Sequence, residues 1–114
     1  ACKVMDIATF DQKDPNFRSF CRELKAYIEL SGGYILKSYA YAMKEQSEQK
    51  VCMLLMEYMK RGTLVDVLSS NEKLSLHQKL NIARQIASGM AKIHNHGMVH
   101  RDIRPDNILI NEYY

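Results

Sequence analysis

Apolar side chains recur at steps of three and four residues after position 15, which is the spacing of one face of a helix. Asp14 can accept hydrogen bonds from the free N–H groups of the first helical turn, and Pro15 suits the first helical position. A helix is therefore predicted from Pro15 to the Ser-Gly-Gly sequence at 31–33. Its apolar face is expected to contain Phe17, Phe20, Cys21, Leu24, Tyr27 and Ile28.

Two strands are predicted after this helix. Residues 34–43 are rich in aromatic and β-favouring side chains, and residues 51–56 form an uninterrupted apolar run. The polar segment 44–50 between them suits an exposed connector. Two antiparallel strands are therefore expected, with the second strand buried on both faces. Residues 1–5 read as a further strand at the start of the chain.

Capping signals introduce two helices in the second half of the chain. Residues 63–66 and 75–78 both have the spacing of a capping box, in which the first and fourth residues bond each other's backbone. The first box predicts a short helix, and the second predicts a long helix over 76–96 that Gly97 ends. The inward face of the long helix is expected to contain Leu76, Leu80, Ala83, Ile86, Ala87, Met90 and Ile93.

A polar loop follows the long helix. Residues 98–99 and 108–110 are apolar on either side of it, which predicts a hairpin of two short strands. Strands thus cluster at the front of the chain and helices at the back. This order predicts an α+β fold with two lobes joined near residues 57–62.

The composition, with 46% apolar and 25% charged residues, is typical of one small soluble globular unit. The longest apolar run, 51–56, is far shorter than the ~20 residues needed to cross a bilayer, so no membrane span is expected. Sixteen Lys and Arg residues are interleaved with thirteen Asp and Glu residues, which argues against a nucleic-acid partner. Three widely spaced cysteines favour a reducing, cytoplasmic location. Because the chain opens without Met inside a strand pattern, we expect a piece of a longer protein.

The densest group of functional side chains lies in residues 100–107. Asp102 could accept a proton, Arg104 could stabilise the charge of a phosphate, and Asn107 could bind a hard cation. These are the chemical parts of a phosphoryl transfer. The alternative reading, from these residues alone, is a solvated charged turn.

The sequence His100-Arg101-Asp102 followed by Asn107 resembles the H-R-D-x-x-x-x-N catalytic loop of protein kinases, and Pro105 is similar to the Ser/Thr form of that loop. The resemblance implies that Asp102 orients the acceptor hydroxyl and takes its proton. It implies that Asn107 helps to hold Mg²⁺. Arg104 stands where Ser/Thr kinases usually carry Lys, which keeps the positive charge but replaces a point charge with a planar fork.

The first residues resemble the end of the V-A-x-K strand of the same family. The resemblance implies that Lys3 binds the α- and β-phosphates of ATP and that Ala1 packs on adenine. Glu23 lies in the helix that corresponds to the family's C helix, where the resemblance implies an ion pair with Lys3. The spacing of Glu23 from Phe20 and Tyr27 predicts that it lies on the inward apolar stripe of this helix.

Residues 54–59 resemble the strand and hinge that hold adenine in the family. The resemblance implies backbone hydrogen bonds to adenine from Glu57 and Met59, a gatekeeper position for Met56, and a floor under adenine from Leu109. It covers all 114 residues. It implies a partial, bilobal kinase domain with an upper-lobe part at 1–56, a hinge at 57–62 and a lower-lobe part at 63–114.

The function implied is a protein kinase that transfers the γ-phosphoryl group of ATP, with Mg²⁺, to a protein Ser or Thr hydroxyl. Regulatory proteins are further expected partners. The alternatives are a pseudokinase or scaffold, a tyrosine or dual-specificity kinase, and a phosphotransferase acting on a small molecule. In the family a Gly-rich loop precedes these residues and an Asp-Phe-Gly metal site follows them, so we expect the 114 residues alone to be inactive.

Overall fold

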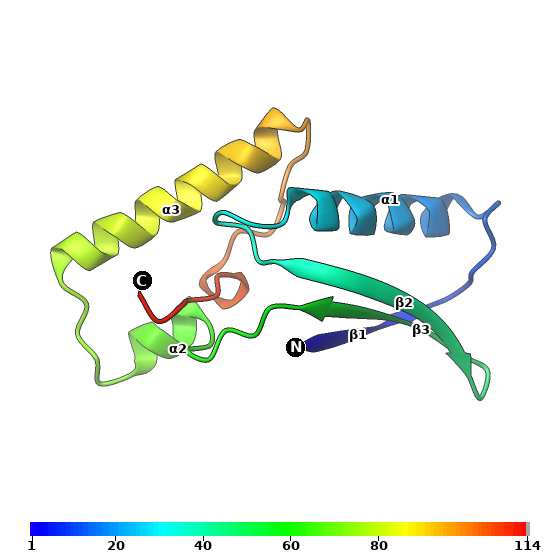
Figure 1. Cartoon of the computed structure of the whole chain (residues 1–114), viewed down its shortest axis with the longest axis horizontal. Coiled ribbons are helices and arrows are strands. Elements are labelled where there is room, and N and C mark those ends of the chain that lie inside the picture. The colour runs from blue at the N-terminus through cyan, green and yellow to red at the C-terminus, as the bar shows by residue number, and fades with distance from the viewer. Residues whose placement is uncertain (114) are drawn as a thin grey trace. The chain divides into compact units, whose positions relative to one another are not determined.

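The computed structural model describes residues 1–113 and has the α+β architecture that the sequence predicts (Figure 1). The chain divides into two compact units, of which the first is Ala1–Glu57 and the second begins at Tyr58. No helix within residues 1–113 combines the length and the apolar content that a membrane span requires.

The first unit is built on a three-stranded antiparallel sheet. Its strands are β1 (Cys2–Ile7), β2 (Ser38–Gln46) and β3 (Gln49–Met56), in the order β1-β3-β2. The antiparallel pair β2 and β3 is confirmed, but the predicted connector 44–50 is mostly strand. Only Ser47 and Glu48 separate the two strands, and both have positive φ (50° and 67°), the backbone of tight two-residue hairpins.

Helix α1 (Pro15–Leu30) begins and ends where the sequence predicts. The Asp14 carboxylate caps it by accepting hydrogen bonds from the backbone N–H groups of Asn16 (2.8 Å) and Phe17 (3.3 Å). The helix packs on one face of the sheet through Leu24, which contacts Cys52 and Leu54 of β3. Burial in this core raises the pKa of the Cys52 thiol. Half-buried residues complete the cluster: Met5, Ile7, Phe20, Ile28, Met43 and Met56.

The prediction that residues 51–56 are buried on both faces is wrong. Cys52 and Leu54 are buried, whereas Leu55 between Leu54 and Met56 is 49% exposed. Side chains alternate along a strand, and α1 covers only the face that carries Cys52 and Leu54. On the opposite face, Val4 of β1 is also exposed.

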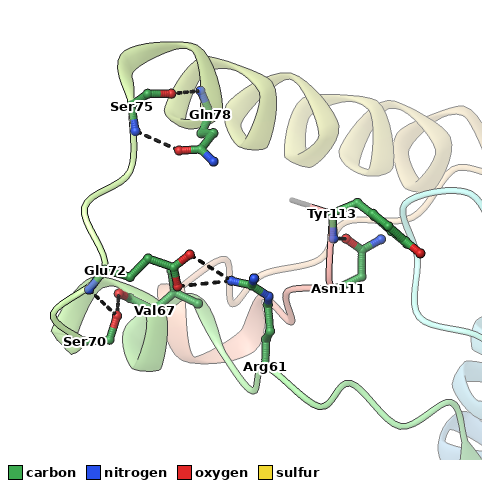
Figure 2. A network of polar contacts seen from close by, with 8 residues as sticks. All are labelled: Arg61, Val67, Ser70, Glu72, Ser75, Gln78, Asn111 and Tyr113. Atoms are coloured by element: carbon green, nitrogen blue, oxygen red, sulfur yellow. Dashed lines mark hydrogen bonds and ion pairs between the residues drawn. The ribbon is translucent and has the colours of Figure 1, made fainter.

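The second unit contains α2 (Leu64–Ser69), α3 (Leu76–Asn95) and a short 3₁₀ helix, η1 (Pro105–Asn107). Both predicted capping boxes are confirmed. Figure 2 shows the second: the Ser75 N–H donates to the Gln78 amide oxygen at 2.8 Å, and the Gln78 N–H donates to the Ser75 hydroxyl at 3.1 Å.

The capping box of α2 holds a charged carboxylate. The Asp66 carboxylate accepts hydrogen bonds from the Thr63 backbone N–H at 2.8 Å and from the Thr63 hydroxyl at 3.0 Å. These hydrogen bonds stabilise the ionised form and lower the pKa of Asp66. Its position in the first turn also favours negative charge, because free N–H groups point toward it.

The core of the second unit joins Val67 of α2, Ile82 of α3 and Ile110. The predicted inward face of α3 is wrong in part, because Leu76 and Leu80 are 72% and 61% exposed. Apolar residues occupy more than one side of this helix, so their spacing alone does not identify the buried side. The side that faces the core contains Ile82, Ile86, Gly89 and Ile93, whereas Ala83 and Ala87 are exposed.

The predicted hairpin of residues 98–99 with 108–110 is also wrong. Residues 98–99 form no strand, and the apolar triplet pairs instead with the segment that leads into α2. The Leu64 N–H donates to the Ile108 carbonyl at 2.7 Å, and the Ile110 N–H donates to the Gly62 carbonyl at 3.0 Å. These bonds anchor the end of the loop 100–107 to α2.

An ion pair and short hydrogen bonds fix the connection from α2 to α3 (Figure 2). The Arg61 guanidinium contacts both carboxylate oxygens of Glu72, at 3.3 and 3.1 Å. The Ser70 hydroxyl donates to the Val67 carbonyl at 2.7 Å and accepts from the Glu72 N–H at 3.2 Å. Arg61 thereby ties the approach to α2 to the segment that follows this helix.

Candidate functional site

The side chains of Asp102 and Asn107 meet in the loop between α3 and residue 108. The Asn107 amide nitrogen donates to the Asp102 backbone carbonyl and to its carboxylate Oδ2, both at 2.9 Å. Two bonds from one amide hold the Asp102 carboxylate in a fixed orientation against its own backbone. They occupy the Asn107 amide nitrogen, so the amide oxygen takes no part in these two contacts.

His100 and Arg101 shape the backbone before the carboxylate. The Asp102 N–H donates to the ring Nδ1 of His100 at 3.1 Å, so this ring nitrogen carries no proton. Arg101 has φ of 73°, a left-handed conformation that is uncommon outside glycine. The strained residue turns the chain so that the His100 ring can bind the Asp102 backbone.

The η1 turn fixes Asn107. The Asn107 N–H donates to the Arg104 carbonyl at 2.9 Å, and Pro105 occupies the first helical position. The Arg104 guanidinium pairs with the Asp106 carboxylate at 3.0 Å, and both side chains are exposed. Arg104 therefore keeps its charge close to the loop but pairs it with Asp106, two residues further on.

The loop is open to solvent, since Asp102, Arg104 and Asn107 are all exposed. Within residues 1–113 there is no cluster of three or more His, Cys, Asp or Glu side chains that could bind a metal ion. The Asn107 amide oxygen is one oxygen donor, which suits a Mg²⁺ ion that completes its shell with water, phosphate oxygens and other ligands. The loop thus fits a shared magnesium site rather than a closed one.

Lys3 lies in the first unit, directly opposite Leu54 across the β1–β3 pair. Directly paired residues point to the same face of a sheet, so Lys3 is on the face that α1 covers. The prediction that Glu23 rides on the buried stripe of α1 is wrong: Glu23 is exposed, and Leu24 beside it is buried. Among the ion pairs of the described residues, none joins Lys3 to Glu23.

The segment after β3 contains the two residues, Glu57 and Met59, that are predicted to bind adenine through their backbone groups. The Glu57 N–H donates to the Lys37 carbonyl at 2.8 Å, and the Met59 carbonyl accepts from the Gly62 N–H at 3.1 Å. The Glu57 carbonyl and the Met59 N–H have no backbone partner within the described residues. One acceptor and one donor, two residues apart, are therefore open to a ligand.

Two further predicted site residues, Ala1 and Met56, lie at strand ends of the first unit, and a third, Leu109, lies in the second unit. Ala1 is exposed, and its amino group donates to the Met56 carbonyl at 2.7 Å. Met56 is half-buried and packs on the core of the first unit. Leu109 is 39% exposed and pairs with Thr63 through an isolated bridge in the second unit.

One group of residues on α1 was not predicted from the sequence. Arg18, Cys21, Arg22 and Lys25 line a pocket together with Gln12. The signal was present in the sequence, because basic residues at 18, 22 and 25 follow the four- and three-residue steps of one helix side.

The family model and the relatives that match this chain are all protein kinases. The family model described as protein tyrosine and serine/threonine kinase matches residues 1–114. Serine/threonine-protein kinase PrkC of Bacillus subtilis is 35% identical over 110 residues, which cover 95% of this chain and 16% of that protein. The maternal embryonic leucine zipper kinase of Xenopus laevis is 31% identical over 112 residues, which cover 98% of this chain and 16% of that protein.

A third relative, named "Probable serine/threonine-protein kinase", comes from Dictyostelium discoideum. It is 30% identical over 112 residues, which cover 96% of this chain and 7% of that protein. The chain therefore spans between 7 and 16% of the length of these three relatives.

Proposed function

Since the chain belongs to the protein tyrosine and serine/threonine kinase family, we propose that the protein containing it transfers the γ-phosphoryl group of ATP to a Ser or Thr hydroxyl of a protein substrate. The observation that carries this proposal is the pair of 2.9 Å hydrogen bonds from Asn107 to Asp102. They bring together the two residues that the catalytic-loop motif requires at a separation of five positions.

Asp102 is the proposed proton acceptor. Its carboxylate Oδ2 is held by Asn107, and the second oxygen is left to accept a hydrogen bond from the substrate hydroxyl. As the hydroxyl oxygen bonds to the γ-phosphorus, the bond from phosphorus to the bridging oxygen of ADP breaks. The hydroxyl proton passes to Asp102, and because the loop is exposed this proton can leave to solvent.

Asn107 is the proposed ligand of Mg²⁺. Its amide nitrogen is occupied by Asp102, so the amide oxygen is the atom left for the cation. When bound, Mg²⁺ would neutralise charge on the phosphates of ATP. The Arg104 guanidinium, two residues after the carboxylate, would stabilise negative charge on the transferred group, exchanging its contact with Asp106 for the phosphoryl oxygens.

The remaining site residues are proposed to bind ATP. Lys3 would bind the α- and β-phosphates and Glu23 would orient its ammonium by an ion pair. The open Glu57 carbonyl and Met59 N–H would bind the adenine edge. Nonpolar contact with the ring would come from the predicted pocket residues Ala1, Met56 and Leu109.

A preference for Ser and Thr over Tyr is supported by Pro105, which opens η1, and by the names of the relatives. Residues 1–114 contain no G-x-G-x-x-G and no Asp-Phe-Gly sequence. We therefore propose that these residues by themselves have no measurable transfer activity, because two parts of the phosphate and metal site are missing from them. We further propose that the protein is cytoplasmic and that regulatory proteins bind it.

The test is ATP-dependent transfer of radiolabelled phosphate by the longer protein to peptides that carry Ser, Thr or Tyr. Asp102→Asn should lower kcat by about 10²- to 10⁴-fold, the usual contribution of a general base. Glu112→Gln is the matched control, since it makes the same carboxylate-to-amide change at an exposed position of the same segment, and it should keep full activity. Unchanged activity in Asp102→Asn would overturn the proposal, and transfer to Tyr alone would overturn the Ser/Thr preference.

A further inference from the structure

A shallow pocket of about 270 Å³ opens on one side of α1. Arg18, Cys21, Arg22 and Lys25 of this helix line it, and Gln12 closes it from the segment before the helix. Three of the five lining residues are cationic and none is acidic. The pocket therefore carries a charge of about +3, as much as the net charge of the whole chain.

None of Arg18, Arg22 and Lys25 takes part in an ion pair within residues 1–113. Elsewhere in the chain Arg61 and Arg104 do pair with carboxylates, at 3.1 and 3.0 Å. Like charges at four-residue spacing on a helix repel each other, so a bound anion would stabilise this side of α1.

The basic side of α1 differs from the side that carries Glu23. Successive helix residues turn by about 100°, so Lys25 and Glu23 lie on opposite flanks of the buried Leu24. Arg18 and Lys25 each come one position after a buried residue, Phe17 and Leu24, so they lie on the same flank of the helix. The pocket is therefore separate from the residues proposed to bind ATP, and it does not depend on the proposed phosphoryl transfer.

We propose that this pocket binds the phosphate of a phosphoserine or phosphothreonine in a peptide segment of another protein. A phosphate monoester carries about −1.5 to −2 charges and three acceptor oxygens, which matches three cations better than a single carboxylate does. Two guanidinium groups can each bind phosphate through two parallel hydrogen bonds. The Gln12 amide adds an uncharged donor at the edge of the pocket.

A single phosphate fits the arrangement better than an extended polyanion. The three cations lie within about two turns of one helix and line one pocket. Along the rest of the chain, basic residues are interleaved with acidic ones. A phosphopeptide is therefore the occupant that the charge distribution favours, and a membrane surface rich in anionic lipid is the competing occupant that the test includes.

The test measures binding of a fluorescent peptide of alanine and glycine with one central phosphothreonine to the chain of residues 1–114. This peptide should bind at least about tenfold more tightly than its unphosphorylated form, as expected for one to three charge-assisted hydrogen bonds. The triple variant Arg18→Gln, Arg22→Gln, Lys25→Gln should lose that difference. A control with the same loss of charge, Lys60→Gln, Lys73→Gln, Lys79→Gln, should retain it, because these exposed lysines lie outside the pocket.

A second measurement leaves the three cations in place, so it does not depend on whether the triple variant folds. Cys21 lines the pocket and Cys52 is fully buried, so in a Cys2→Ser chain iodoacetamide should react at Cys21. Bound phosphopeptide should slow that reaction by about tenfold at saturation, and the unphosphorylated peptide should not.

Three results would overturn the proposal. They are equal binding of the phosphorylated and unphosphorylated peptides, an equal loss in the pocket and control variants, and unprotected Cys21 in the presence of saturating phosphopeptide. Binding to phosphatidylserine vesicles that the pocket variant abolishes, without phosphopeptide binding, would assign the pocket to a membrane surface instead.

Discussion

At the scale of single residues, hydrogen bonds to charged side chains govern the local geometry. The amide of Asn107 orients the Asp102 carboxylate, and the Thr63 N–H and hydroxyl hold the Asp66 carboxylate. The pKa of Asp66 is lowered because both bonds stabilise its ionised form, and this carboxylate has a structural role at the start of α2.

The lowered pKa of Asp66 predicts a dependence of stability on pH. A carboxyl group whose pKa is lower in the folded chain than in the unfolded chain stabilises the fold at any pH above the unfolded value, about 3.9. This contribution is lost as the pH falls through the lower folded pKa. We expect the melting temperature of residues 1–114 to fall more steeply below pH 4 than that of Asp66→Asn, as measured by circular dichroism. Parallel curves for the two proteins would contradict this role of Asp66.

At the scale of elements, the helix caps were predictable from sequence, whereas the two hairpin connections and the buried side of α3 were not. The helix starts can be predicted because each N-cap side chain accepts a hydrogen bond from the backbone only two or three residues away. These N-caps are Asp14, Thr63 and Ser75. The buried side of α3 depends on Val67 and Ile110, which are distant in sequence. The strand-like triplet 108–110 likewise pairs with a distant segment, which no local pattern identifies.

The buried side of α3 can be tested by two neighbouring substitutions. Ile82 is 6% exposed and packs on Val67 and Ile110, whereas Leu80 is 61% exposed. Ile82→Ala should lower the free energy of unfolding by about 2 to 5 kcal/mol, because it removes buried methyl groups and leaves a cavity. Leu80→Ala should change it by less than about 0.5 kcal/mol, as exposed positions usually do. Denaturant titration measures both, and an equal loss would show that Leu80 also faces the core.

At the scale of the whole molecule, the chain is two compact units that each carry part of the predicted site. Ala1, Lys3, Glu23, Met56 and Glu57 belong to the first unit, and Met59, Asp102, Arg104, Asn107 and Leu109 belong to the second. Asp102 and Asn107 are close in sequence, so their contact needs only local structure, and the roles of the loop residues stay predictions. The ion pair between Lys3 and Glu23 stays a prediction. Glu23 is exposed on α1, and its position in the helix does not by itself bring its carboxylate to Lys3.

Asp102 and Asn107 are proposed to act as one catalytic unit, and a double-mutant cycle on kcat of the longer protein distinguishes this from two independent roles. Asn107→Ala should lower kcat by about 10- to 100-fold, because Asp102 loses two hydrogen bonds and the cation loses a ligand. Asp102→Asn should cost more, and the double variant should be no slower than Asp102→Asn alone, since residues that act together have non-additive effects. A double variant whose loss in kcat equals the product of the two single losses would show that the two residues act independently. An active Asp102→Asn protein would show that Asp102 is not the proton acceptor.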